Sequence, residues 1–267
     1  MIEQTRLRVR LAFRVVGMLV ALASAGLAVP HVTTAAEITV LCPRALQQVV
    51  ATAAQDFQRR TRHTVWLSYG TTDVIATRAL TEEADVIIGG DSALTQLEAR
   101  GTIRGGSRVA IGRVGLGVAV RAGMPVPDVT SERALRRTIL QATSLGYADL
   151  AGGGQAAHVT QLLETLTIAA LVLPKTSVFP DGRRTLEALA RDRVALVLAP
   201  ISEIVGSEGV KLAGPLPDGL QQTLAYAAAV MSRSAAVDVA SAFLSHLRSA
   251  GVREQLKAGG VEPVTEP

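Results

Sequence analysis

Residues 84–103 read ADVIIGGDSALTQLEARGTI, and this stretch decides the fold class. It opens with Ala-Asp-Val-Ile-Ile (84–88), which is apolar apart from Asp85 and predicts a strand that is buried on both faces of a sheet. The run ends at Gly-Gly-Asp (89–91), residues 92–100 follow with the period of a helix, and Gly101 ends that helix. A buried strand that leads directly into a helix is the repeating unit of an α/β protein.

The same alternation of strands and helices extends through the rest of the chain. Short β-branched or apolar runs predict strands at 37–41, 64–68, 143–147, 174–179, 194–199 and 222–231. Segments with helical spacing predict helices at 45–60, 73–80, 131–141, 155–169, 182–191, 235–250 and 252–258. Thr71 or Thr72 is expected to cap the helix at 73–80. The order of these elements predicts an α/β fold.

Residues 109–121 (VAIGRVGLGVAVR) differ from their surroundings. They show little helical spacing, and Gly112, Gly115 and Gly117 interrupt them. We interpret this run as the segment that carries the chain from one domain into another.

The first 36 residues have the composition of an export signal. Four arginines precede an uncharged apolar run at 15–29, which ends near the small residues 34–36. This pattern predicts a secretory signal peptide that is cleaved before Glu37. The run is shorter than the roughly 20 residues that span a bilayer, although an uncleaved anchor stays open as an alternative. We therefore expect a protein that is exported to the periplasm.

Charge and composition exclude several classes of partner. Residues 37–267 hold 23 basic and 22 acidic side chains, without a basic stripe that alternates with aromatic residues, so we expect no nucleic-acid partner. Aromatic residues make up only 3% of the chain, which argues against the aromatic clefts that bind sugars or nucleobases. The single cysteine, Cys42, has no partner for an intramolecular disulfide. No His or Cys spacing indicates a metal site, and we expect no cofactor.

From residue 37 to 260 the chain resembles the periplasmic solute-binding proteins of molybdate-type uptake systems. The motifs that carry this resemblance are EITVLCPRAL (37–46), SYGTTDVIATR (68–78), the stretch at 84–103, VGLGVAVRAG (114–123) and SEGVKLAGPLP (207–217). The resemblance implies a two-lobe α/β fold in which each lobe is a mostly parallel sheet flanked by helices, with two crossover strands. It places residues 37–115 and 205–267 in one lobe and residues 119–200 in the other.

The resemblance also identifies loops that would hold the ligand, and here the chain departs from the family. Members that bind molybdate usually have Ala-Ala-Ser in the first loop and a serine run in the second, where this chain has Cys-Pro-Arg (42–44) and Thr-Thr-Asp (71–73). A tyrosine that many members place in the second lobe corresponds to Pro200. These differences favour another oxyanion or an organic carboxylate as the ligand.

The residues themselves also favour an anion. Arg44, at a strand-to-helix turn, could hold a carboxylate together with helix amides, or could be a solvated surface residue. Thr71 and Thr72 could bind the ligand, cap a helix, or do both. The three glycines at 152–154 leave amide groups bare at a helix start, although a flexible turn explains them as well. The expected ligand-binding residues are Arg44, Tyr69, Thr71, Thr72, Asp91, Gly153, Gly154 and Gln155.

Other reactive side chains have ordinary structural explanations beside functional ones. Cys42 could be a nucleophile but is more simply a small buried thiol. Asp73 and Asp91 could act as a general base or as helix caps, and His158 could face the cleft. Tyr147 and Tyr69 could line a cleft or pack in a core. We assign no residue as catalytic.

The sequence therefore predicts a monomeric periplasmic protein that binds a small anion and delivers it to the membrane permease of an ABC transporter. A first alternative is an enzyme on the same fold, similar to aconitate isomerase, that isomerises an unsaturated tricarboxylic acid. In that case Arg44 would anchor the substrate and Asp73, Asp91 or His158 would move a proton. A second alternative is a ligand-sensing module for a membrane partner.

Overall fold

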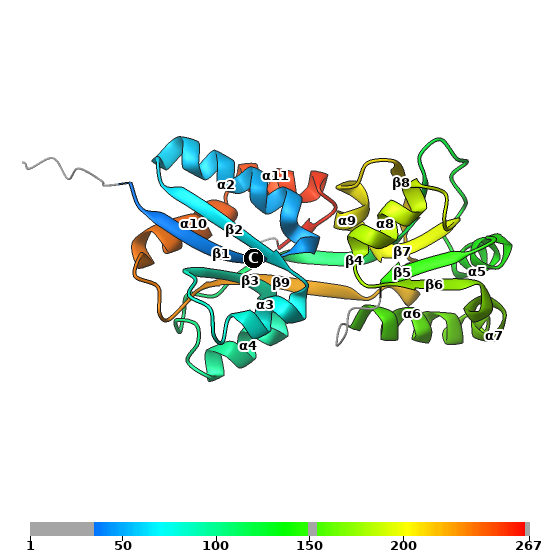
Figure 1. Cartoon of the computed structure of the whole chain (residues 1–267), viewed down its shortest axis with the longest axis horizontal. Coiled ribbons are helices and arrows are strands. Elements are labelled where there is room, and N and C mark those ends of the chain that lie inside the picture. Colours follow the sequence, from blue (N-terminus) through cyan, green and yellow to red (C-terminus); the bar gives the residue numbers. More distant parts are fainter. Residues whose placement is uncertain (1–34, 149–153, 265–267) are drawn as a thin grey trace, which may run out of the picture. The chain divides into compact units, whose positions relative to one another are not determined.

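The computed structural model describes residues 35–148 and 154–264 (Figure 1), which fall within one compact unit. The predicted signal peptide, residues 1–36, lies outside the described residues except for Ala35 and Ala36 and stays a prediction. Among the described residues, no single helix has the length and apolar composition to cross a membrane. Residues 156–165 and 169–175 pass that test only as a pair, and the pair is bent by 116°.

The first of two sheets combines the strands nearest the amino terminus with two strands from the last third of the chain. In spatial order these are β2 (Thr64–Gly70), β1 (Glu37–Pro43), β3 (Val86–Gly90), β9 (Thr223–Val230) and the first half of β4 (Val109–Arg121). The pairs of β1 with β2 and with β3 are parallel, whereas β9 runs antiparallel to both β3 and β4. The short strand β10 (Glu262–Pro263) also pairs with β4 in this sheet. The return of the chain through β9 therefore places a carboxy-terminal strand between β3 and β4, antiparallel to both.

Helices cover both faces of the first sheet (Figure 1). One core contains apolar side chains of α2 (Gln47–Thr61), α10 (Val237–Leu247) and α11 (Ala250–Ala258), and the rings of Phe57 and Phe243 pack edge to face there with centroids 5.3 Å apart. The opposite core contains apolar side chains of α3 (Thr72–Arg78) and α4 (Asp91–Ala99). Burial on both faces explains why the strand at 84–88 has no polar alternation.

Strand β4 belongs to both sheets. Its residues up to Gly115 pair with β9, and its residues from Leu116 onward pair with β7 (Leu196–Pro200) and β8 (Val210–Pro215). The glycine-interrupted run at 109–121 is thus a single strand that carries the chain from one sheet into the other, as its sequence predicts.

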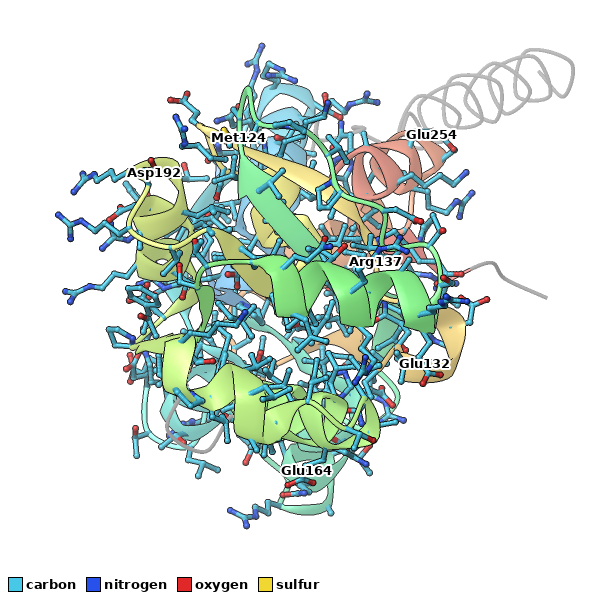
Figure 2. The ribbon with its side chains drawn as sticks, turned by 90° about the vertical axis from the view of Figure 1, so that its right-hand side faces the viewer. Met124, Glu132, Arg137, Glu164, Asp192 and Glu254 are labelled. Atoms are coloured by element: carbon cyan, nitrogen blue, oxygen red, sulfur yellow. The ribbon has the colours of Figure 1, made fainter. Side chains whose placement is uncertain are left out.

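The second sheet has the order β4, β7, β5 (Leu145–Ala148), β6 (Thr176–Phe179), and β5 is parallel to both neighbours. One core holds apolar residues of α5 (Glu132–Gln141), α6 (Gly154–Thr165) and α7 (Ala169–Val172), and another holds those of α8 (Gly182–Ala190) and α9 (Ile201–Val205). Helix α5 buries Leu135 and Ile139 and leaves Glu132 and Arg137 on the surface (Figure 2).

The predicted α/β class is confirmed, and the differences lie in three places. The helix expected at 155–169 ends at Thr165, because Thr167 takes a left-handed φ of 55° before α7 begins. Helix α9 was not expected. Strand β8 pairs with β4 in the second sheet, whereas the predicted boundary assigned everything after residue 205 to the first lobe. Strand β8 lacks an apolar run and is half-exposed along its length, so its sequence gave little sign of it.

Candidate functional site

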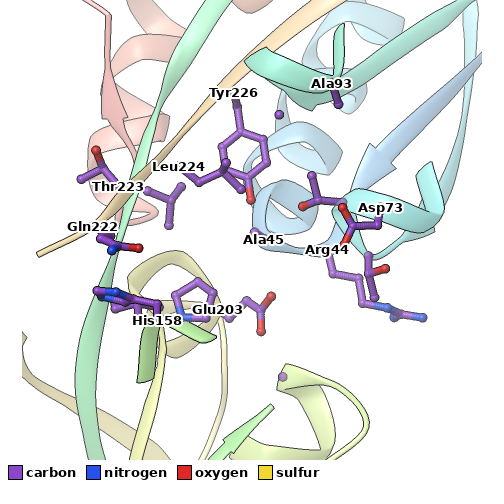
Figure 3. A pocket seen from close by; sticks show the side chains of 18 of the residues that line it. Arg44, Ala45, Asp73, Ala93, His158, Glu203, Gln222, Thr223, Leu224 and Tyr226 are labelled. Atoms are coloured by element: carbon purple, nitrogen blue, oxygen red, sulfur yellow. The ribbon is translucent and has the colours of Figure 1, made fainter. Parts of the chain in front are cut away.

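A cavity of about 310 Å³ lies where β4 passes from the first sheet to the second, and residues of both sheets line it (Figure 3). Strand β4 contributes Val114, Gly115 and Leu116, the three residues at the change of sheet. The loops after β1, β2 and β3 reach it from the first sheet, and residues of α6, α8 and α9 reach it from the second. The cavity therefore collects residues that are distant in the sequence.

Arg44 lies in the cavity wall at the end of β1. It opens a short 3₁₀ turn (Arg44–Leu46), whose buried Leu46 and Ala45 fix the turn against the core. The Arg44 guanidinium forms no hydrogen bond or ion pair with any described residue. Such a group is an available cation for a carboxylate or another oxyanion.

The loop after β2 brings two hydroxyl groups to the same cavity. The Thr71 side chain accepts a hydrogen bond from the backbone N of Val74 at 3.4 Å, and so it caps α3 as predicted while it also lines the cavity. Thr72 lines the cavity next to the buried phenol of Tyr226. Thr71 therefore combines helix capping with lining the cavity, whereas Thr72 lines the cavity and does not cap the helix.

Strand β9 supplies Tyr226, which sequence reasoning missed. Burial raises the pKa of Tyr226, and a hydrogen bond with the Thr72 side chain partly opposes that rise, so the phenol stays neutral. The only sequence signal was a single tyrosine in an alanine-rich central strand. Pro200, the position at which many members of the resembled family have a tyrosine, also lines the cavity. In this chain the phenol in the cavity comes from Tyr226 of β9.

Glu203 is a second residue of the cavity that the sequence did not indicate. It lies on α9, directly after β7, and its carboxyl group sits so close to Gly182, the first residue of α8, that a Cβ on Gly182 would collide with it. Burial and the neighbouring carboxylate of Asp181 raise the pKa of Glu203 to about 7, against the opposing influence of Arg44. Glu203 thus exchanges a proton near neutral pH.

His158 lies on α6 and is only 7% exposed, and it lines the cavity as the sequence suggested it might. Neither ring nitrogen has a hydrogen-bond partner among the described residues. Burial lowers the pKa of His158, so the imidazole is neutral at neutral pH. In Figure 3, His158 lies beside Gln222 on one side of the cavity, and Arg44 and Asp73 lie on the other.

The remaining predicted residues lie in several places. Tyr69 packs against the core of the first sheet, and Asp91 begins α4 with Arg108 at 3.9 Å; neither lines the cavity. Gly153 lies outside the described residues. Gly154 and Gln155 begin α6, the helix that carries His158, and only that placement is described.

Two other candidates have structural explanations. Cys42 is fully buried in the core of the first sheet, and burial raises the pKa of its thiol, which makes it a poor nucleophile. Tyr147 is buried in the core of the second sheet. Asp73, in contrast, does line the cavity.

Comparison with known proteins now places the fold in a family. A family model described as Bacterial extracellular solute-binding protein matches residues 38–262. The chain belongs to this family. The resemblance drawn from the loop motifs is therefore confirmed.

Relatives of this solute-binding protein include an aconitate isomerase of Pseudomonas sp, which is 30% identical over 186 residues, 70% of each chain. The periplasmic molybdate-binding protein of Azotobacter vinelandii superposes with a TM-score of 0.67 at 17% identity, over 86% of this chain and all of that one. The sulfate-binding protein SubI of Mycobacterium tuberculosis H37Rv gives 0.66 at 14% identity, over 86% and 87%. At these identities the two structures show a shared fold.

Proposed function

We propose that this protein binds a small organic polycarboxylate in the cavity between its sheets and presents it to the permease of an ABC transporter in the bacterial periplasm. The observation that carries the proposal is the guanidinium of Arg44, which has no partner among the described residues, in the wall of a cavity that also offers the hydroxyl groups of Thr71, Thr72 and Tyr226. A cation with hydroxyl donors around it is a site for carboxylate oxygens.

The size of the cavity favours a polycarboxylate over a tetrahedral oxyanion. A volume of about 310 Å³ lies at the lower end of the range of pockets that hold small organic molecules. A tetrahedral oxyanion has five non-hydrogen atoms and would leave most of that space empty. A dicarboxylate or tricarboxylate fills it and reaches residues of both sheets.

The expected mechanism is a shift between open and closed states. A ligand that contacts Arg44 on one side of the cavity and His158 or Gln222 on the other stabilises the closed state, in which both sides are near the ligand. The crossover strands β4 and β9 would absorb the movement. The permease would then recognise the closed state.

The test is calorimetric titration with citrate, trans-aconitate, tricarballylate, sulfate and molybdate. We expect a tricarboxylate to bind and Arg44→Ala to weaken it by about 2–4 kcal/mol, the loss of a charge-assisted contact. Arg133→Ala is the matched control, because Arg133 is exposed on α5 and does not line the cavity. Preference for molybdate or sulfate, or equal affinities of the two variants, would contradict the proposal.

A second candidate function is isomerisation of an unsaturated tricarboxylate, and a specific observation favours it. His158 and Glu203 line one cavity, and their surroundings lower the pKa of the first and raise the pKa of the second, so a neutral base and a carboxyl group that is partly protonated near neutral pH share the cavity. A 1,3-proton shift needs such a pair. His158 would take a proton from the carbon beside a carboxylate, and the double bond would shift by one position toward that carbon. Glu203 would then protonate the carbon at the other end of the three-carbon unit. The relative at 30% identity is an aconitate isomerase.

Proton NMR of trans-aconitate with the protein in D₂O separates the two functions. An isomerase forms cis-aconitate and introduces deuterium, and His158→Ala abolishes both changes while trans-aconitate still binds. A receptor leaves the bound trans-aconitate unchanged, and that result would reject the second candidate.

A further inference from the structure

Glu203 has no counter-ion of its own in the cavity. Its carboxyl group forms no hydrogen bond or ion pair with a described residue, and its close neighbours are Gly182 and the carboxylate of Asp181. Gly182 is buried and has no room for a Cβ, so the first turn of α8 holds the carboxyl group in place.

The charges around Glu203 do not favour an ionised carboxyl group beside a bound anion. The titratable groups that face it or share its cavity are Arg44 from the turn after β1, Asp73 from α3, Asp181 at the start of α8, His158 from α6 and Tyr226 from β9. Strands β4 and β7 add only Val114, Gly115, Leu116 and Pro200, and β8 adds no residue to the lining. Asp181 has Arg184 of α8 beside it at 3.9 Å, so Arg44 would have to balance the carboxylates of Asp73 and Glu203 together with the ligand.

This excess of negative charge falls by one if Glu203 carries a proton. We propose that Glu203 binds the ligand as a neutral carboxylic acid, which donates a hydrogen bond to a ligand carboxylate, so that an anion captured above neutral pH enters together with one proton. The inference rests on the proposed binding of a polycarboxylate and adds a binding residue to that site.

The chemistry of the free site agrees with this assignment. Burial and the charge of Asp181 raise the pKa of Glu203 to about 7, and a bound anion would raise it further. Proton uptake is therefore expected only above that pH, where the free carboxyl group is ionised. His158 is also unprotonated in this range, because burial lowers its pKa, so a His158 variant is needed to separate its proton uptake from that of Glu203.

The experiment is calorimetric titration of trans-aconitate into the protein at pH 6, 7, 8 and 8.5, with two buffers of different ionisation enthalpy at each pH. At pH 8 the wild-type protein should take up about 0.9 proton per ligand, and its affinity should fall about 16-fold from pH 7 to 8.5. Glu203→Gln should take up none and should keep one affinity throughout.

Two controls assign the proton. Glu208→Gln changes an exposed carboxylate of the same region that does not line the cavity, and His158→Ala removes the other titratable group; both should keep the uptake. Binding without proton uptake, or uptake that persists in Glu203→Gln, overturns this inference and leaves the proposed function standing. Failure of trans-aconitate to bind the wild-type protein at pH 6 overturns the proposed function as well.

Discussion

The side-chain amide of Gln221 forms two hydrogen bonds with the backbone of Leu116. Its Oε1 accepts from the Leu116 N at 2.8 Å, and its Nε2 donates to the Leu116 O at 2.9 Å. Leu116 is the first residue of β4 that pairs in the second sheet, and a Cβ on the preceding Gly115 would lie 2.8 Å from the Gln221 side chain. Gln221 therefore satisfies the backbone at the point where the strand changes partners.

Gln221→Ala should lower the free energy of unfolding by about 1–3 kcal/mol, because it leaves the Leu116 N without its partner, whereas the Leu116 O keeps the hydrogen bond from the Leu216 N. Urea unfolding followed by circular dichroism measures this change. Gln96→Ala is the control, since Gln96 is exposed in the middle of α4, and its free energy should stay within about 0.5 kcal/mol of the wild type. Equal stabilities of the two variants would show that the amide bridge contributes nothing.

Gly182→Ala should destabilise the protein by about 1–3 kcal/mol and weaken ligand binding, because the new methyl group occupies the place of the Glu203 carboxyl group. Gly219→Ala should change neither quantity, since a Cβ at Gly219 meets no atom within 4 Å. Thermal unfolding and calorimetric titration measure both effects. If the double variant Gly182→Ala, Glu203→Ala is no more stable than Gly182→Ala alone, the collision is not the cause.

The pH dependence of stability should carry the signature of Glu203. Its folded-state pKa of about 7 lies above its ordinary value of 4.5, so the folded state binds more protons, and the contribution of Glu203 to stability is lost as pH rises from about 4.5 to 7. His158 acts in the opposite direction over part of this range, because its pKa is lowered on folding. The difference between wild type and Glu203→Gln isolates the Glu203 contribution.

We expect Glu203→Gln to gain stability relative to the wild type between pH 5 and pH 8, by on the order of 2 kcal/mol. Melting temperatures at half-unit steps of pH measure the difference. A constant difference across that range would show that Glu203 titrates alike in the folded and unfolded states. Glu208→Gln serves again as the exposed control.

The Cys42 thiol should resist a thiol reagent such as dithionitrobenzoate in the native protein and react fully in guanidinium chloride. It is fully buried, and burial raises the pKa of the thiol, so little thiolate is accessible. Ser92→Cys provides the comparison, because Ser92 is exposed at the cavity and should react readily in the native state. Native reactivity of Cys42 close to that of Ser92→Cys would mean that the first loop opens.

Strand β8 could not be predicted from the local sequence, in contrast to the strands β3 and β7. The buried strands β3 and β7 are continuous apolar runs, and their neighbours α4 and α8 begin and end near residues that favour helix termini, so local pattern predicted them. Strand β8 is half-exposed and pairs only at one edge of β4, so its existence depends on a partner about 90 residues away in the chain. No local pattern carries that information.

The candidate site divides in the same way. Arg44, Thr71 and Thr72 follow strands of a predicted parallel sheet, and the carboxyl ends of such strands meet at one edge, so their convergence was predictable. Glu203 and Tyr226 come from a short helix and a strand that reach the cavity only through the crossover of β4 and β9. In the sequence Gly182 is an ordinary helix start, and only the tertiary structure places the Glu203 carboxyl group against it.

The sequence by itself determined the α/β class, the order of most elements, the family and a threonine-capped loop beside Arg44, because hydrophobic period, capping residues and loop motifs are local properties. The tertiary structure alone decided which charges share a cavity. The pKa values of Glu203 and His158 depend on burial and on groups contributed by separate elements, and these distances exist only after the chain has folded.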